Sequence, residues 1–254
     1  MSKSLTPAMR RARIAAHVAL RGQCSIPDLA QRFNMSGETI RRDVAHLAQA
    51  GRLLRMHGGA RALPAPFEGR FASRLRRHVA EKRRIAEKLA AAIAPDQTLF
   101  MDTGSTTLLA AEALSGHSGL VVISNSLRIA EALGQGAGQA EVHLLGGRYR
   151  ADNAQTVGEG ALQDLHRFNA DIAVLTVGSL GPDGAADFSS DEAEVARAMI
   201  KAARSVWILA DHSKFEKHAP FRLCPLEKID RLISDQAPPP ALARALAEAG
   251  VNIL

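Results

Sequence analysis

The chain has 254 residues, of which 46% are hydrophobic, enough for a small domain and a second one of moderate size. No stretch approaches the roughly 18 apolar residues of a membrane-spanning helix, and the first residues lack the apolar core of a signal peptide. Cys24 and Cys224 stand far apart without metal-ligand spacing, so we expect reduced thiols in a cytoplasmic protein, with no metal and no cofactor. Aromatic residues make up 4% of the chain, which argues against binding of single strands by base stacking.

Charge is divided unevenly along the chain, whose net charge is +6. Residues 1–84 hold 18 basic and 5 acidic side chains, whereas residues 85–254 hold 14 basic and 21 acidic ones. A chain that was basic only for solubility would spread its charge. A basic module followed by an acidic one is the pattern expected when only the first part meets nucleic-acid phosphate.

Three short helices are predicted near the start of the chain. The first covers residues 10–20, where apolar side chains recur at helical spacing. The second begins at residues 25–28, where a serine precedes a first-turn proline and an acid follows three positions later. Residues 34–35 then make a tight turn into the third helix. A helix, a short turn and a second capped helix form the helix-turn-helix arrangement, which we place at about residues 24–43.

The third helix has two different faces. Ser36 is a good N-cap, because its hydroxyl can accept a hydrogen bond from a first-turn amide. Ile40, Val44 and Leu47 form an apolar stripe that is expected to pack on the neighbouring helices. The opposite side and its flanks are polar and hold two arginines, which suit guanine edges and phosphates in a major groove. An ordinary surface helix with a solvated charged face is the alternative. The candidate DNA contacts in this helix are Ser36, Gly37, Glu38, Thr39, Arg41 and Arg42.

A basic turn follows the third helix, which is expected to end at Gly51. An apolar pair then lies between two arginines, the second of which is Arg55, and precedes a glycine pair at residues 58–59. This pattern predicts a short two-stranded wing that carries positive charge. Residues 1–61 are thus predicted to form a winged helix-turn-helix domain that binds double-stranded DNA, with Arg55 as a further contact.

A linker is predicted at residues 62–80, because residues 62–69 contain two prolines and a glycine. A helix is expected over residues 70–93, with apolar side chains at helical spacing from Ile85 onward. This helix carries a basic cluster that can either reach the DNA backbone or simply keep the helix solvated, and we favour the second interpretation. The cluster consists of Arg74, Arg76, Arg77, Lys82, Arg83 and Arg84.

The last part of the chain, residues 81–254, alternates predicted strands with helices. Such alternation implies an α/β fold with a mostly parallel sheet that helices cover on both faces. Ligands of such sheets bind at the carboxyl ends of the strands. The predicted strands are residues 98–101, 120–124, 142–145, 171–177 and 206–210, and residues 190–203 form one of the helices.

Small and polar residues gather at those strand ends. Residues 102–107, Asp-Thr-Gly-Ser-Thr-Thr, offer backbone amides, hydroxyl donors and a positive helix end, the ingredients of a phosphate cradle. A plain helix cap with a tight turn is the alternative. Lys214 follows a later strand and can pair with a phosphate or with an acid such as Glu192. The same edge also holds Asn125, Ser126, Gly146, Gly147 and Arg148, and this convergence favours the phosphate site.

These motifs resemble the DeoR family of bacterial transcriptional regulators over nearly the whole chain. Residues 36–43, Ser-x-x-Thr-Ile-Arg-Arg-Asp, and residues 57–60, His-Gly-Gly-Ala, look like that family's DNA-binding signature. By this resemblance His57 is a further candidate DNA contact. The stretches that are similar to the sensor domain of the family are residues 102–107, 124–126, 145–147 and 211–215.

The resemblance implies a winged helix-turn-helix joined to a sensor with the sugar-phosphate isomerase fold, as in ribose-5-phosphate isomerase. It also implies repression of a sugar or polyol catabolic operon, which ends when a phosphorylated sugar or polyol binds the sensor. Residues 211–215 and 235–240 look most like the glycerol-3-phosphate regulon repressor type, whereas residues 104–107 and 188–192 differ from it, so the effector stays open. By this match the pocket is lined by Asp102, Gly104, Ser105, Thr106, Thr107, Asn125, Gly146, Gly147 and Lys214.

Two ligands are then expected to compete for the protein. Operator DNA favours one arrangement of the reading heads and the sugar phosphate favours another, so each weakens the binding of the other by the same factor. Operators are usually read by dimers. We therefore expect a homodimer or a homotetramer, with half-sites about one helical turn or its multiples apart.

A sugar-phosphate isomerase or deaminase fused to a DNA-binding module is the second hypothesis. Such an enzyme needs a carboxylate placed to move a proton on an open-chain sugar. Residues 183–187, Asp-Gly-Ala-Ala-Asp, superficially resemble an isomerase carboxylate motif. However, the preceding strand is expected to end at Gly178 and residues 179–182 to form a loop, which leaves no acid or base at the strand end. The sequence therefore predicts a regulator and not an enzyme.

Overall fold

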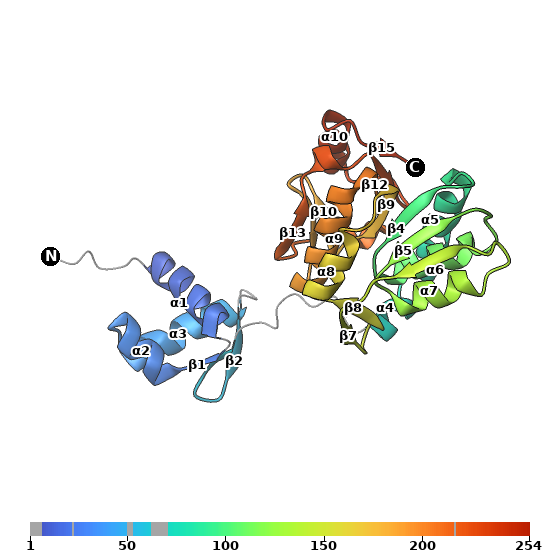
Figure 1. Cartoon of the computed structure of the whole chain (residues 1–254). Helices are drawn as coiled ribbons and strands as arrows, with labels where there is room; N and C mark the ends of the chain where they lie inside the picture. The colour runs from blue at the N-terminus through green and yellow to red at the C-terminus, as the bar shows by residue number, and fades with distance from the viewer. Residues whose placement is uncertain (1–6, 22, 50–52, 62–70, 216) are drawn as a thin grey trace. The chain divides into compact units, whose positions relative to one another are not determined.

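The computed structural model of the chain describes residues 7–21, 23–49, 53–61, 71–215 and 217–254. The chain divides into two compact units, Met1–Phe67 and Glu68–Leu254, whose elements are drawn in Figure 1. Among the described residues, no helix is long and apolar enough to cross a membrane.

Helices and a small antiparallel sheet make up the described part of the first unit. They are α1 (Pro7–Arg21), β1 (Gln23–Ser25), α2 (Ile26–Phe33), α3 (Gly37–Gln49), β2 (Leu54–Met56) and β3 (Gly59–Arg61). The strand order is β1-β3-β2, and both pairs are antiparallel. The predicted two-stranded wing is therefore present as β2 and β3, and β1 extends it by a strand that the sequence did not predict.

One small core holds the three helices of the first unit together. Ile14 of α1 and Leu29 of α2 are fully buried in it, as are Ile40 and Val44 on the apolar face of α3. Burial of such a side chain contributes about 1.5–3 kcal/mol relative to leaving it exposed. Residues 24–43, where the helix-turn-helix was predicted, contain α2, the turn after it and the start of α3.

Local chemistry sets the two ends of α2. Ser25 caps the start, because its Oγ accepts a hydrogen bond from the backbone N–H of Asp28 at 3.1 Å. Asn34 caps the other end in a left-handed conformation, with φ of 50°, which asparagine adopts more readily than most residues. The turn into α3 follows directly. The predicted helix stop at Gly51 lies outside the described residues, and α3 itself ends at Gln49.

A seven-stranded sheet forms the centre of the described second unit. Its strands are β4 (Thr98–Met101), β5 (Val121–Ser124), β6 (Glu141–Leu144), β9 (Ala170–Thr176), β12 (Ala203–Leu209), β14 (Arg231–Ile233) and β15 (Asn252–Ile253). Neighbours are parallel throughout, in the order β15-β14-β12-β9-β4-β5-β6. The predicted α/β class and parallel sheet are confirmed.

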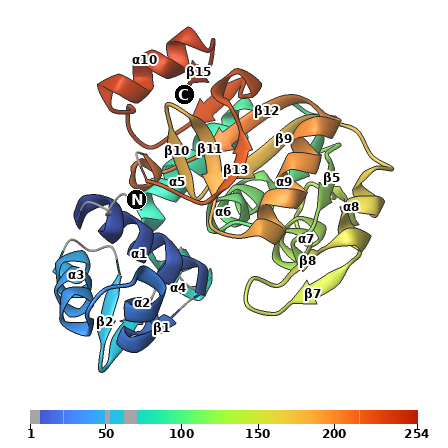
Figure 2. The same ribbon diagram turned by 90° about the vertical axis from the view of Figure 1, so that its left-hand side faces the viewer.

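Helices cover both faces of this sheet. They are α4 (Phe71–Arg76), α5 (Val79–Ala92), α6 (Ser105–Leu114), α7 (Leu127–Gly134), α8 (Glu159–Leu165), α9 (Ser190–Ala202) and α10 (Pro240–Glu248), with short 3-10 turns η1 (His212–Lys214) and η2 (Leu226–Lys228). Figure 2 shows α8 and α9 on one side of the sheet, with α6 and α7 on the other. The unit is therefore a three-layer α/β sandwich.

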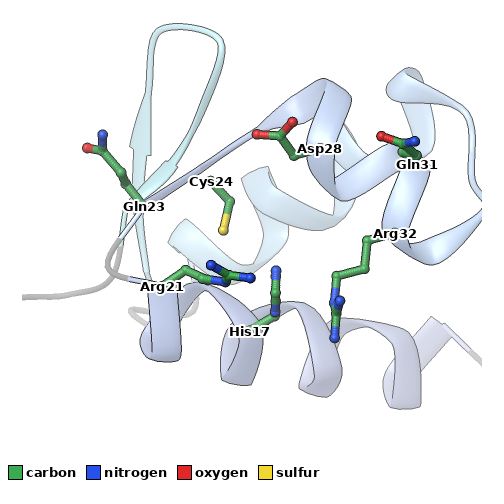
Figure 3. Close-up of a pocket in the computed structure, with 7 residues that line it drawn as sticks. All are labelled: His17, Arg21, Gln23, Cys24, Asp28, Gln31 and Arg32. Carbon is green, nitrogen blue, oxygen red and sulfur yellow. The ribbon is translucent and has the colours of Figure 1, made fainter.

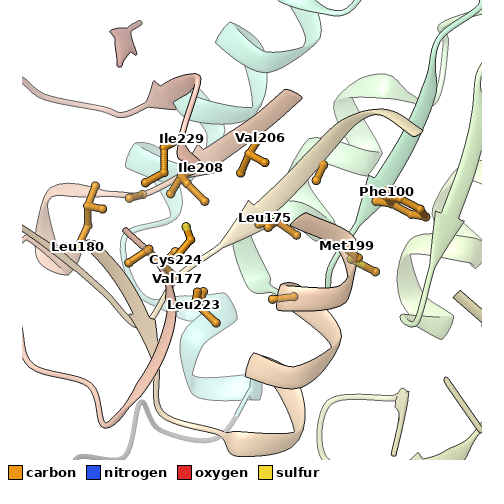
Figure 4. Packing of buried hydrophobic residues seen from close by; sticks show 14 of the residues in the cluster. Phe100, Leu175, Val177, Leu180, Met199, Val206, Ile208, Leu223, Cys224 and Ile229 are labelled. Atoms are coloured by element: carbon orange, nitrogen blue, oxygen red, sulfur yellow. The ribbon is translucent and has the colours of Figure 1, made fainter. Parts of the chain in front are cut away.

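Side chains of the central strands alternate between two cores. In β9, Ile172 and Val174 belong to the core shared with α5, α6 and α7, whereas Ala173 and Leu175 belong to the core shared with α8 and α9. Figure 4 shows part of the second core, which includes Leu175 and Met199 of α9. Strands that are buried on both faces read as continuous apolar runs, which is why the sequence identified them.

Two smaller β elements of the second unit were not predicted from the sequence. β7 (Arg148–Arg150) and β8 (Gln155–Val157) form an antiparallel hairpin, and β10 (Ser179–Gly181), β11 (Gly184–Asp187) and β13 (Phe221–Cys224) form a sheet in the order β10-β11-β13. The prediction that residues 179–182 form a loop is wrong. Pro182 and Asp183 make the tight turn of a β10–β11 hairpin, and Gly184 supplies the positive φ of 111° that follows.

The helix predicted over residues 70–93 is interrupted between α4 and α5. His78 stands there in a left-handed conformation, with φ of 53°. α4 and the first residues of α5 thus fall within residues 62–80, the range predicted to be a linker, while residues 62–70 lie outside the described part of the chain.

An aromatic anchor explains why α4 belongs to the second unit. Phe71 is 2% exposed, and the guanidinium groups of Arg74 and Arg128 lie 5.3 and 5.2 Å from the centre of its ring. Contacts of this kind between a guanidinium and an aromatic face are favourable by about 0.5–2 kcal/mol each. Arg128 belongs to α7, so the anchor ties α4 to the helices beside the sheet.

Candidate functional site

The first turn of α3 is capped as the sequence predicts. The backbone N–H of Thr39 donates to Oγ of Ser36 at 3.2 Å, and the two side-chain hydroxyl oxygens are 2.9 Å apart. Gly37 is the first residue of the helix. These bonds fix the direction in which α3 leaves the turn.

The polar side of α3 is open to solvent. The side chains of Arg41 and Arg42 are 61% and 80% exposed, and each has a nitrogen within 3.5 Å of a carboxylate oxygen of Glu38. Exposed ion pairs of this kind contribute little, so both guanidinium groups can turn to another partner at small cost. Arg55 and His57, on the strand β2 and in the turn after it, are also exposed.

A buried cluster of one carboxylate and two arginines joins α1 to α3, and it was not predicted from the sequence. Asp43 is 2% exposed, and its carboxylate oxygens lie 2.6 and 2.9 Å from Nε of Arg10 and of Arg11. Burial alone would raise the pKa of Asp43, but the hydrogen bonds and charges of the two arginines outweigh it, so the pKa is lowered. Asp43 therefore ties α3 to α1.

A groove lies between α1, β1 and α2 in the first unit. It has a volume of about 480 Å³, and Figure 3 shows Arg21 and Arg32 near His17 along it. Burial, then the charges of Arg32 and Arg21, lower the pKa of His17. Burial and the nearby Asp28 raise the pKa of the Cys24 thiol, so that thiol stays protonated and weakly reactive.

The second unit has a topological switch point between β4 and β9. From this pair of neighbours the sheet continues through β5 and β6 on one side, and through β12, β14 and β15 on the other. Crevices outside the carboxyl ends of such strands are where ligands of open α/β sheets bind. The residues that follow β4 are Asp102 to Thr107, the predicted cradle.

Asp102, directly after β4, is hydrogen-bonded to Thr176 at the end of β9, on the other side of the switch point. Its Oδ2 accepts hydrogen bonds from the backbone N–H of Thr176 at 2.9 Å and from the hydroxyl of the same residue at 3.1 Å. Burial raises the pKa of Asp102 to about 8, against the effect of the Thr176 bonds and with help from the charges of Asp187 and Glu192. Asp102 therefore keeps a proton at neutral pH and can donate as well as accept.

The turn after Asp102 leaves no room for a side chain at Gly104. A Cβ atom there would lie 2.2 Å from Oγ1 of Thr176 and 2.9 Å from Oγ1 of Thr107. The hydroxyl of Thr107 donates to the backbone oxygens of Asp102 and Gly104, at 3.0 and 3.2 Å. Thr107 is fully buried and supports the turn, whereas Ser105 and Thr106 stand in the first turn of α6.

Lys82 reaches this turn from α5, contrary to the interpretation of its basic cluster as a solvated face. The residue is 4% exposed, and its Nζ donates to Oγ of Ser105 at 2.9 Å. A sequence signal existed, because Lys82 lies three and seven positions before Ile85 and Leu89, on the buried face of α5.

A chain of hydrogen bonds links the ends of β4 and β5 to α9. The hydroxyl of Thr103 donates to Oδ1 of Asn125 at 3.0 Å, and Nδ2 of Asn125 lies 3.5 Å from Oε1 of Gln155. Gln155 and Asn153 donate to the same oxygen of Glu192, at 2.9 and 2.8 Å. Asn125 and Glu192 thus belong to one network, which the unpredicted strand β8 completes.

The remaining predicted residues stand further along the same strand ends. Ser126 caps α7, with its Oγ accepting from the backbone N–H of Ile129 at 3.4 Å. Gly146 donates its N–H to Asp164, Gly147 packs closely on α8, and Arg148 pairs at 3.0 Å with Asp191. Lys214 is the last residue of η1, directly after β12. A hydrogen bond, close packing and an ion pair thus account for Gly146, Gly147 and Arg148 without a ligand.

The prediction that no acid lies at the end of β9 is wrong, because Asp187 lies close to it. The β10–β11 hairpin returns the chain, so that the charge of Asp187 contributes to the raised pKa of Asp102. Its Oδ1 accepts from the backbone N–H groups of Phe188 and Ser189, at 2.6 and 3.0 Å. The position of Asp187 depends on the pairing of β10 with β11. It could not be predicted from the sequence, because a loop was expected at residues 179–182.

Comparisons with known proteins agree with this two-part organisation. The DeoR-like helix-turn-helix domain matches residues 10–64, and the DeoR C terminal sensor domain matches residues 77–236. The HTH-type transcriptional repressor CsqR of Escherichia coli (strain K12) is 33% identical over 251 residues, which are 98% of this chain and 96% of that protein. The glycerol-3-phosphate regulon repressor of the same organism is 33% identical over 242 residues, 93% of this chain and 94% of that protein.

Among solved structures, ribose 5-phosphate isomerase A from Methanocaldococcus jannaschii is similar to 54% of this chain, over 55% of its own length, with a TM-score of 0.41 and 14% identity. The matches to both domain models, and the relatives that share a third of their residues over nearly the full length, establish the family. The chain belongs to the DeoR family.

Proposed function

We propose that the chain is a transcriptional repressor that binds operator DNA through α3 and the wing, and that a phosphorylated sugar or polyol releases it. The observation that carries the proposal is the polar turn after β4, which is built around buried side chains at a topological switch point. The exposed arginine pair on a capped helix of the first unit supports the DNA-binding half.

The chemistry of the turn supports a phosphate ester as the effector. Ser105 and Thr106 lie at the positive end of α6, where backbone amides and hydroxyl groups suit phosphate oxygens. Asp102, Asp187 and Glu192 lie close enough for their charges to interact, and carboxyl groups suit the hydroxyls of a sugar or polyol. Glycerol 3-phosphate is our first candidate, because one relative is named for it.

We further propose that the second unit binds this effector without converting it. Relatives named as repressors support this assignment, although Asp102 and Asp187 are acids near the strand ends. Incubation of the full chain with ribose 5-phosphate and with glucosamine 6-phosphate tests it. We expect no product, and turnover of either compound would overturn the proposal.

Release from DNA is the central test. The full chain selects duplexes from a random library, and the enriched duplex is then titrated with glycerol 3-phosphate and a panel of other sugar and polyol phosphates. We expect at least one ester to weaken DNA binding by about 5- to 150-fold, the usual range of coupling between two sites. If no duplex is enriched, or if no phosphate ester weakens binding, the proposed function fails.

The oligomeric state belongs to the same proposal. A homodimer or homotetramer with two reading heads would require paired half-sites about one helical turn or its multiples apart. Sedimentation of the free chain and of its complex with the enriched duplex measures the number of copies. A single copy on a single half-site would contradict this part of the proposal.

A further inference from the structure

The groove between α1, β1 and α2 of the first unit has no part in the proposed function. Its volume of about 480 Å³ falls within the range of about 300–1,000 Å³ that is usual for small-molecule sites. Among the described residues that line it, none belongs to α3 or to the wing strands β2 and β3. The groove is therefore separate from the surface proposed to read DNA.

More positive than negative charge lines this groove. Arg21 of α1 and Arg32 of α2 lie along it, as Figure 3 shows, and Asp28 is the one acid among its described lining residues. Both arginines are exposed, and neither forms an ion pair within the described part of the chain. Two cationic groups that reach one hollow from different helices attract an anion.

The imidazole of His17 is close enough to both arginines to be affected by their charges. Burial, then the charges of Arg32 and Arg21, lower its pKa, so the ring is mostly neutral at neutral pH. The other ionisable groups that line the groove are Asp28 on α2 and the protonated thiol of Cys24 on β1. An anion bound between the guanidinium groups would therefore change the charge that His17 experiences.

A phosphate group suits these side chains well. A guanidinium presents its N–H donors as a planar fork, which matches the oxygens of a phosphate. The oxygens of a phosphate point in several directions, so one group can accept from Arg21 on one helix and from Arg32 on the other. The groove also holds the amide side chains of Gln23 and Gln31, which can bond to hydroxyl groups on the rest of a ligand.

We propose that this groove is a second ligand site, in which Arg21 and Arg32 bind the phosphate group of a small, freely diffusing phosphorylated molecule beside His17. The inference does not depend on the effector site of the second unit. A free ligand is favoured over the DNA backbone, because the groove is concave and no described residue of α3 or of the wing lines it. A phosphate beside His17 would favour the imidazolium form, so binding would raise the pKa of His17 and take up a proton.

The test follows the ring of His17 by NMR in the full chain with labelled histidine, as the pH is varied with and without a probe. The probes are inorganic phosphate and pyrophosphate, and His17→Gln identifies the signal. Arg21→Ala with Arg32→Ala removes the two guanidinium groups, and Arg21→Lys with Arg32→Lys keeps their charge. Arg204→Ala with Arg244→Ala is the matched control, because it removes the same charge from exposed positions of the second unit.

In the wild type and in the control pair, we expect each probe to raise the pKa of His17. In the alanine pair, we expect the pKa to be higher than in the wild type without any probe, because two repelling charges are gone. Addition of a probe should not raise it further, and the affinity at this site should be about 10-fold weaker or more. The lysine pair should retain the response, since an ammonium also attracts phosphate.

Three results would overturn the inference. The first is a pKa of His17 in the wild type that neither probe changes, including the case in which only duplex DNA changes it. The second is an equal response in the alanine pair, which would place the anion elsewhere. The third is a response that disappears in Ser105→Ala with Lys214→Ala, because the phosphate would then bind in the second unit. If that pair loses the effector but keeps the response of His17, the two sites are independent, as proposed.

Discussion

The candidate ligand-binding side chains are exposed on α3 of the first unit and buried at the switch point of the second unit. On α3, Arg41 and Arg42 extend into solvent and share one exposed carboxylate. At the switch point of the second unit, Ser105 and Asn125 are 6% and 1% exposed and are held by hydrogen bonds before any ligand arrives. The difference follows from the size of the expected partner. A duplex offers a large surface to side chains that order on contact, whereas a small phosphate ester needs a site that is already formed.

The largest effect is expected at the exposed arginine pair. Arg41→Ala together with Arg42→Ala should weaken binding of the enriched duplex by about 100-fold or more, because each good arginine contact in the major groove is worth about 1–3 kcal/mol. Fluorescence anisotropy at fixed salt measures the loss. Arg204→Ala with Arg244→Ala removes the same charge from exposed positions of the second unit and should leave binding nearly unchanged. Equal losses in the two double variants would reduce the role of α3 to net charge.

The next effect is on the stability of the first unit, through the buried carboxylate of Asp43 that ties α3 to α1. Asp43→Asn should destabilise the first unit by roughly 3 kcal/mol, because it leaves two arginines without their buried partner. Hydrogen exchange of α1 and α3 measures the change. Asp28→Asn, at an exposed position of α2, serves as the control. The lowered pKa of Asp43 also fixes the pH dependence. Its contribution is present above the ordinary carboxyl value of 3.8 and is lost as the pH falls through the lower folded pKa, so acidification should harm the wild type but not Asp43→Asn.

A similar effect is expected at the cradle of the second unit. An effector at about 100 times its Kd stabilises the state that binds it by roughly 2.7 kcal/mol. Ser105→Ala with Lys214→Ala should remove that thermal shift. Ser115→Ala with Lys228→Ala is the matched control, because Ser115 stands at the far end of α6 and Lys228 ends η2 as Lys214 ends η1. A shift that persists undiminished in the first pair would move the effector to another place in the unit.

The effect that is smallest at each step of pH, and therefore the most gradual, is expected at Asp102. A raised pKa means that its contribution to stability is fully present below the ordinary value of 3.8 and is lost as the pH rises toward about 8. Asp102→Asn cannot ionise, so its Tm should rise relative to the wild type by the equivalent of up to about 1.4 kcal/mol per pH unit between pH 5 and 8. Above that range the two curves should run parallel. Asp183→Asn in the exposed β10–β11 turn should follow the wild type, and a constant offset for Asp102→Asn would show that Asp102 is already ionised at pH 5.

The helices and the wing of the first unit could be predicted because their signals are local, whereas β1 was not predicted. Ser36 caps the helix that it precedes, and Ile40 and Val44 are buried because they share one helical face. Five of the seven strands of the parallel sheet were also predicted, since each is a short apolar run between polar turns. The shorter strands β14 and β15 were not predicted. Asp102 and Gly104 then follow from the rule that ligand sites lie at strand ends.

The parts that were missed depend on pairing between distant segments. Asp187 reaches the switch point only because β10 and β11 form a hairpin, and Gln155 meets Glu192 only through β8. Lys82 was expected to be solvated because it belongs to a cluster of basic residues. Its spacing from Ile85 nevertheless places it on the buried face of α5. Local patterns therefore locate a site, while the partners that tune it come from the tertiary fold.

The raised pKa of both cysteine thiols has a practical consequence for labelling this protein. Burial raises the pKa of the Cys224 thiol to about 11, and burial beside Asp28 raises that of Cys24. Reagents that require a thiolate react slowly with such groups at neutral pH. A dye attached through Arg76→Cys, at an exposed position of α4, can therefore be installed selectively while both native cysteines remain, and its emission would report on that helix in real time.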